Sequence, residues 1–137
     1  MNLSIRQLKT EDYNELCEWW KWFRFPAPSL DLLPDRGESG FIVYDDETKE
    51  NVVAGFLYTT NSYFSMCEFI VSNPQIKDKK VREESINMLI DVISLYAKEC
   101  GCKLIFTSLK HPSLKNRFVD RGYKIGSTNT TELIKIL

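Results

Sequence analysis

A strand end, a loop and a long helix follow one another in the stretch SNPQIKDKKVREESINMLIDVISLYAKECG, residues 72–101. Nucleotide-binding folds often carry a glycine-rich loop at such a junction, because bare backbone N–H groups and a helix N-terminus together bind phosphate. Here no glycine precedes Gly101, and the loop and first helical turn carry four basic residues instead: Lys77, Lys79, Lys80 and Arg82. Three interpretations stay open: a degenerate phosphate loop, a charge-based substitute for one, and an ordinary basic helix start.

Size and charge place the chain among globular proteins. Its 137 residues are enough for one domain with a real core, so we assign residues 1–137 to a single domain. The formal net charge of −1 makes nucleic acid an unlikely partner and gives no attraction to an anionic membrane. The apolar runs are too short to span a bilayer, and the N-terminus lacks the apolar region of a signal peptide. We therefore expect a cytoplasmic protein with no membrane partner.

The cysteines give no sign of a metal site. They stand at positions 17, 67, 100 and 102, form no CxxC pair, and have only one histidine to join them. Cys17 and Cys67 lie within apolar patterns, where free cysteine behaves as a small hydrophobic residue. Reduced thiols and no metal are expected.

Hydrophobic periodicity predicts strands grouped first, then strands alternating with helices. The first half is expected to contain a strand at 3–8, a helix at 11–23 capped by Thr10, an irregular proline-rich loop at 24–40, and a hairpin of strands 40–46 and 51–60. A strand at 65–72 and a long helix, capped by Asp78 and ended by Gly101, are expected next. A buried strand at 103–109, a short helix from Pro112 to Gly122, and final strands at 123–126 and 130–137 complete the expected order. This order predicts an α/β (α+β) fold, with a mixed, mainly antiparallel sheet flanked by helices.

Four segments carry a resemblance to a known family: IRQLKTEDYNELCEWW at the start, VSNP before the long helix, YAKECGCKLIF at its end, and NRFVDRGYKIG after it. In this order they resemble the GCN5-related N-acetyltransferase (GNAT) superfamily over nearly the whole chain. The tryptophan-rich helix, the proline loop and GFIV also resemble small GNAT-like proteins met in bacteria and their phages.

The resemblance implies that acetyl-CoA is the cofactor. The family loop is close to R/Q-x-x-G-x-G/A, with backbone amides that hold the cofactor pyrophosphate. If Pro74 is aligned with the proline often found before the family loop, Lys77 takes the arginine position and the glycine positions are taken by Asp78, Lys80 and Arg82. If Gly101 is aligned with the end of the family helix instead, the register shifts by about four residues, which is one helical turn. The residues implied in cofactor binding are Phe69, Ile70, Val71, Lys77, Lys79, Lys80, Arg82 and His111.

The resemblance also implies catalytic roles. Glu68 stands where many family members place a glutamate base, and burial in the apolar strand MCEFIVS would raise its pKa. Aligning FVDRGY through Gly122 puts Phe118 at the position of the usual general-acid tyrosine, and phenylalanine has no proton to give. Tyr123 is the first candidate to replace it, with Ser113 and His111 as alternatives.

The tryptophan-rich helix and proline loop fall where the family builds the wall of the acceptor site. Trp19, Trp20 and Trp22 cannot all face one way on a helix, so at least one is expected to face outward. The residues implied in acceptor binding are Trp20, Trp22, Tyr58 and Asn61.

We therefore expect an acetyl-CoA-dependent N-acetyltransferase that acts on an amine of a small molecule or protein. The alternative is a catalytically inactive GNAT-fold protein that serves as a binding or assembly module. A homodimer is one assembly that stays open.

Overall fold

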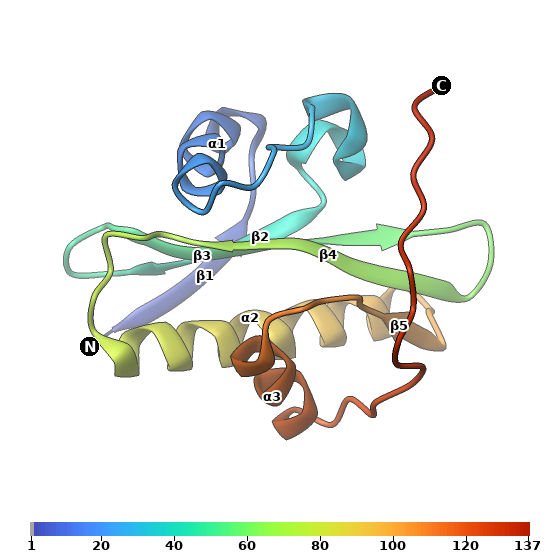
Figure 1. The fold of residues 1–137 in the computed structure, drawn as a ribbon. Helices are drawn as coiled ribbons and strands as arrows, with labels where there is room; N and C mark the ends of the chain where they lie inside the picture. The colour runs from blue at the N-terminus through green and yellow to red at the C-terminus, as the bar shows by residue number, and fades with distance from the viewer. Residues whose placement is uncertain (1) are drawn as a thin grey trace.

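The computed structural model describes residues 2–137, and its centre is one five-stranded sheet (Figure 1). The strands are β1 (Leu3–Gln7), β2 (Gly40–Asp45), β3 (Asn51–Thr59), β4 (Phe64–Ser72) and β5 (Leu104–Phe106). They lie in the sheet in chain order, antiparallel from β1 to β4, while β5 runs parallel to β4. This confirms the predicted mixed, mainly antiparallel sheet.

Helices cover both faces of the sheet (Figure 1). They are α1 (Tyr13–Trp22), α2 (Lys79–Glu99) and α3 (Pro112–Asp120). Helix α1 and the loop after it lie on one side, which we call the α1 face, while α2 and α3 lie on the opposite α2 face. Each face has its own apolar core, because the strand side chains alternate between them. Trp19 and Trp20 are buried in the α1-face core, and Phe118 is buried in the α2-face core.

The helix boundaries follow signals that the sequence carries. The Asp78 side chain accepts hydrogen bonds from the backbone N–H groups of Lys80 and Val81, which caps the start of α2. Gly101 follows the end of α2 at φ +85°, and Gly122 follows α3 at φ +97°. Glycine adopts this left-handed conformation without steric cost, so both helices end where the sequence predicts.

Two predictions for the C-terminal third are wrong. The strand expected at 103–109 is shortened to β5, and its Leu104 and Phe106 side chains are exposed instead of buried. The final strands expected at 123–126 and 130–137 do not form, and the apolar side chains from Leu133 to Leu137 are largely exposed. The physical reason is that a strand needs a partner. This tail runs in an extended path and is not part of the sheet (Figure 1).

A bulge in β4 bends the centre of the sheet. Ala54 pairs with Val71 and Phe56 pairs with Glu68, so Gly55 alone faces two residues of β4, Phe69 and Ile70. A Cβ atom on Gly55 would lie 2.9 Å from Cγ1 of Ile70 and 3.3 Å from Cδ2 of Leu89. The bulge therefore needs glycine at position 55, because Ile70 and α2 pack directly against it.

Replacing Gly55 with alanine is expected to lower the free energy of unfolding by about 1–3 kcal/mol, because the added methyl overpacks the bulge. Chemical denaturation with a fixed m-value measures the change. Gly126→Ala is the matched control, since a Cβ there meets no atom within 4 Å. Equal stability of the two variants would contradict the packing argument.

Candidate active site

Glu68 lies in the middle of β4 and points to the α1 face. Its cross-strand partner is Phe56, which belongs to the α1-face core, and directly paired residues share a face. Its Oε1 accepts a hydrogen bond of 3.1 Å from the backbone N–H of Ser108, just after β5. Burial raises the pKa of this carboxyl, the Ser108 hydrogen bond lowers it and the charge of Glu132 raises it, for a net rise above the ordinary value. A half-buried carboxylate with a raised pKa is suited to take up a proton.

The backbone next to Glu68 has an unusual conformation that the sequence does not predict. Phe69 has φ +59°, a left-handed conformation that is uncommon for an aromatic residue. Phe69 and Ile70 together form the β4 bulge, where the extra residue is left out of the regular ladder. A strained backbone of this kind is often found at functional sites. Backbone amides of this stretch are those expected to contact the acetyl group.

Tyr58 ties the loop after α1 to the sheet beside Glu68. Its hydroxyl donates a hydrogen bond of 2.7 Å to the carbonyl oxygen of Leu32. Burial, and then the charge of Glu68, raise the pKa of Tyr58 to about 12. The phenol therefore stays protonated and holds the loop in place, on the same face as Glu68.

The other residues predicted for acceptor binding are spread out. Trp20 is buried, so it supports the α1-face core from below the surface. Trp22 is the tryptophan that faces outward, with 59% of its surface exposed, and Nζ of Lys77 lies 5.7 Å from its ring centroid. Asn61 is exposed in the turn between β3 and β4. Of this set, Tyr58 feels the charge of Glu68, and Trp20 contacts Phe69, the residue next to Glu68.

The carboxylate of Asp78 caps the N-terminus of α2. Oδ1 of Asp78 accepts hydrogen bonds of 3.0 Å from the Lys80 amide and 3.3 Å from the Val81 amide. These amides are among those that a phosphate would use at a helix N-terminus. A cofactor diphosphate would therefore compete with the Asp78 carboxylate for them.

The basic side chains around this start remain available to an anion. Lys79 and Lys80 make only long ion pairs, of 3.8 Å to Glu83 and 3.9 Å to Glu84, and stay largely exposed. The Arg82 guanidinium lies against the loop, 3.4 Å from the carbonyl oxygens of Ile76 and Lys77. An anion that approached this helix start would meet the exposed Lys79 and Lys80 ammonium groups, whereas Asp78 already occupies two of the amides.

Tyr123 lies on the other side of the sheet from Glu68. It packs in the α2-face core, with its ring 4.8 Å from that of Phe118, and its hydroxyl is 2.7 Å from Oγ of Ser94. Phe118 is buried in the same core. The structure therefore places the candidate general acid Tyr123 and the candidate base Glu68 on opposite faces of the sheet.

Replacing Tyr123 with phenylalanine is expected to cost about 0.5–1.5 kcal/mol of stability, because the hydrogen bond with Ser94 is lost. Any acetyl transfer should persist, since the hydroxyl points into the α2-face core. Parallel assays of thermal unfolding and thiol release measure both effects. A stable variant that has lost turnover would restore the catalytic assignment of Tyr123.

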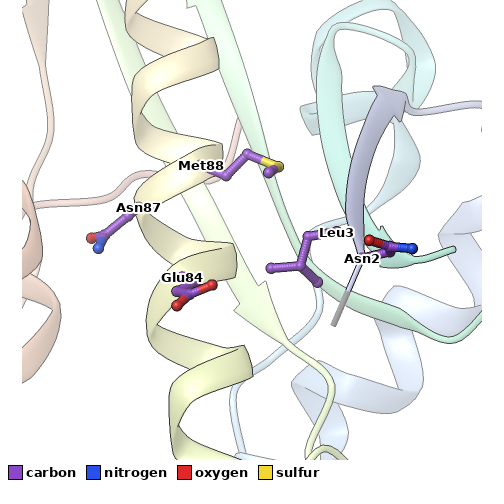
Figure 2. Close-up of a pocket in the computed structure, with 5 residues that line it drawn as sticks. All are labelled: Asn2, Leu3, Glu84, Asn87 and Met88. Carbon is purple, nitrogen blue, oxygen red and sulfur yellow. The ribbon is translucent and has the colours of Figure 1, made fainter. Parts of the chain in front are cut away.

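His111 is exposed, and one surface pocket lies on the α2 face. His111 precedes α3 without capping it through its side chain. A pocket of about 410 Å³ lies between β1 and α2, lined by Asn2, Leu3, Glu84, Asn87 and Met88. Figure 2 shows Leu3 and Met88 on the two sides of this space, while Asn87 points away around the helix. Leu3 and Met88 belong to the α2 face, so this pocket is separate from Glu68.

Three further observations concern the cysteines, possible metal ligands and helix hydrophobicity of residues 2–137. Cys17, Cys67, Cys100 and Cys102 are free thiols. No group of three or more His, Cys, Asp or Glu side chains in that range could hold a metal ion. None of its helices is long and apolar enough to cross a membrane.

Comparison with known proteins gives matches to solved structures. No protein-family model matches the sequence, and no curated protein sequence matches it. N-acetylglutamate synthase from Neisseria gonorrhoeae, solved with coenzyme A and N-acetyl-glutamate, matches 93% of the chain with a TM-score of 0.65 at 18% identity. Glucosamine-6-phosphate N-acetyltransferase from Arabidopsis thaliana matches 98% with a TM-score of 0.66 at 10% identity. Ribosomal-protein-S18-alanine N-acetyltransferase from Escherichia coli matches 92% with a TM-score of 0.69 at 13% identity.

The fold is that of the GCN5-related N-acetyltransferases. The match spans 29% of the synthase chain, 100% of the Arabidopsis enzyme and 80% of the Escherichia coli enzyme. At these identities the shared feature is the fold, and the structural neighbours are acetyltransferases.

Within this GNAT fold, sequence reasoning missed three contributors to the site. Gly55 allows the bulge, Ser108 donates its amide to Glu68, and Phe25 reaches the ring of Phe69, with ring centroids 6.4 Å apart. A glycine within the apolar strand NVVAGFLYTT was a usable signal for the bulge. The other two depend on contacts between segments that only the folded chain brings together.

Proposed function

We propose that the protein is an acetyl-CoA-dependent N-acetyltransferase that acetylates an amine of a small molecule or protein. The observation that carries this proposal is the position of Glu68. Its half-buried carboxylate, with a raised pKa, adjoins a strained bulge on the face covered by α1, in a fold whose neighbours are acetyltransferases. Burying a carboxylate in an apolar strand lowers stability, and a role in proton transfer would explain why one is present there.

Acetyl-CoA supplies the activated acetyl thioester. Glu68 accepts a proton from the acceptor ammonium, directly or through one water, so that the amine becomes neutral and nucleophilic. The amine nitrogen then forms a bond to the carbonyl carbon and the carbon–sulfur bond breaks. Backbone N–H groups of Phe69 to Val71 would donate to the carbonyl oxygen as negative charge develops there.

The departing thiolate needs a proton. Phe118 has none to give and is buried in the α2-face core, and the Tyr123 hydroxyl lies in the same core. We assign this proton to solvent water. Two protons leave the acceptor nitrogen: Glu68 passes the first to solvent before the attack, and the second, lost as the amide forms, replaces the proton that the thiolate takes from water. Starting from the ammonium, the net reaction therefore gives amide, free thiol and one proton released to solvent.

The cofactor phosphates would be held by the start of α2. Lys79, Lys80 and Arg82 supply positive charge there, and Lys77 stands in the preceding loop. Asp78 opposes this binding because its carboxylate already caps the helix. Because exposed cations would hold the phosphates, we expect the affinity for the cofactor to fall strongly as the salt concentration rises.

Thiol release from acetyl-CoA in the presence of a panel of amines tests the proposal, with mass spectrometry to identify the acetylated product. Calorimetric titration with acetyl-CoA tests cofactor binding separately. Product formation supports the enzyme. Cofactor binding without any product would favour the alternative, a GNAT-fold binding or assembly module, for which the buried Phe118 and the Asp78 cap are the supporting observations.

A further inference from the structure

Three aromatic rings surround Phe69 on the α1 face. The ring centroid of Phe69 lies 6.5 Å from Trp20, 6.4 Å from Phe25 and 6.3 Å from Tyr58. The first two pairs meet edge to face, at interplanar angles of 85° and 67°, a preferred arrangement of aromatic rings. Trp20 is buried, whereas Phe25 has 48% of its surface exposed. The cluster therefore has a buried base and an open aromatic surface, which we define as Phe25, Tyr58 and Phe69.

Local backbone geometry holds Phe25 in this position. Arg24 follows α1 with φ +55°, which turns the chain sharply at the helix end. The Phe25 N–H then donates a hydrogen bond of 3.0 Å to the carbonyl oxygen of Trp20. Farther along the same loop, the Tyr58 hydroxyl holds Leu32. The loop is thus tied down on both sides of the aromatic surface, which pre-organises it for binding.

The aromatic surface adjoins the carboxylate of Glu68. Glu68 and Tyr58 share the α1 face, because their cross-strand partners are Phe56 and Met66 in the same register. The charge of Glu68 reaches the Tyr58 hydroxyl and raises its pKa. A molecule that lies on the three rings can therefore present a polar end to Glu68.

The charges around Glu68 are negative. The charge of Glu132 acts on Glu68 and raises its pKa, and the charge of Glu68 acts in the same direction on Tyr58. These two carboxylates attract an ammonium group and repel an added carboxylate or phosphate.

We propose that the aromatic surface binds the side group of the acceptor, so that the acceptor is an amine attached to an aromatic or large apolar group without a carboxylate or phosphate. This inference rests on the proposed acetyl transfer and names its substrate class. It sets the protein apart from an enzyme for glutamate or for glucosamine-6-phosphate, whose anionic groups need a cation to hold them.

A panel of four amines tests the substrate class: 2-phenylethylamine, ethylamine, glutamate and glucosamine-6-phosphate. With saturating acetyl-CoA, kcat/KM for 2-phenylethylamine is expected to exceed that for ethylamine by about tenfold or more, since ring contact and apolar burial favour the larger amine. The two acidic amines should be the poorest acceptors. A preference for either acidic amine would overturn the inference and leave acetyl transfer standing.

Paired variants test the surface itself. Phe25→Ala should remove most of the preference for 2-phenylethylamine. Phe23→Ala should keep it, because Phe23 is similarly exposed, at 54%, on the same loop but forms no ring pair with Phe69. Thermal unfolding confirms that both variants fold. Equal effects of the two substitutions would overturn the assignment of Phe25.

Direct binding separates this inference from the proposed function. If no amine is acetylated, titration of 2-phenylethylamine followed by tryptophan fluorescence still reports on Trp20 beneath the surface. Binding that Phe25→Ala weakens and Phe23→Ala does not would keep the amine site and reject catalysis. Absence of binding as well as turnover would reject both.

Discussion

Replacing Glu68 with glutamine is expected to lower kcat for amine acetylation by about 10²–10⁴-fold, the usual contribution of a positioned general base. The amide keeps the size of the side chain and still accepts the Ser108 N–H bond through its oxygen, so the fold should persist. Thiol release at saturating substrates measures the rate, and thermal unfolding checks the fold. Unchanged kcat would show that Glu68 does not accept the proton.

The pH profile gives a second readout of the same residue. Glu68 must be ionised to accept a proton, so kcat/KM should fall at low pH as it becomes protonated, with a midpoint above the ordinary glutamate value because its pKa is raised. The charge of Glu132 contributes to that rise. Glu132→Gln should therefore move the midpoint to lower pH and retain the rate at the plateau. A shift to higher pH would contradict the arrangement.

Local signals explain why much of the fold was predictable from the sequence. Asp78 caps α2 and Gly101 and Gly122 end their helices, and each acts through its own neighbouring backbone. The short ETKE segment between two apolar stretches likewise predicted the β2–β3 hairpin. The tail beyond Gly122 carries strand-like residues, but strand formation depends on a partner edge. That non-local requirement is why the final strands were predicted and are not formed.

In the candidate site, too, some features depend on local sequence signals and others on contacts between distant segments. The resemblance placed a glutamate base at position 68, and a lone carboxylate in an apolar strand is itself unusual. The ring of Phe25 on Phe69 depends on a left-handed turn at Arg24, and no pattern within the proline-rich loop indicates it. Tyr123 was one of three candidates to replace the general-acid tyrosine of the family, whereas its location depends on how α3 packs on α2. The positions of Phe25 and Tyr123 thus depend on contacts between segments that are far apart in the sequence.

Neutralising the basic start of α2 is expected to weaken acetyl-CoA binding by about ten- to a hundredfold. The variant is Lys79→Gln, Lys80→Gln and Arg82→Gln together; each cation near a phosphate contributes on the order of 1 kcal/mol in water. Its folding should be unharmed, because cations oppose the helix dipole at an N-terminus and their removal relieves that repulsion. Calorimetry at low and raised salt measures the affinity and should show a flatter salt dependence.

Asp78→Asn is the companion variant with the opposite expected sign. Asparagine caps a helix about as well as aspartate, so α2 should still begin at Lys79. The change removes the negative charge that sits on the Lys80 and Val81 amides, and acetyl-CoA should bind severalfold more tightly. Affinity that moves in opposite directions in the two variants would locate the cofactor diphosphate at this helix start. If neither variant alters the affinity, the diphosphate binds elsewhere and the basic residues are an ordinary solvated helix start.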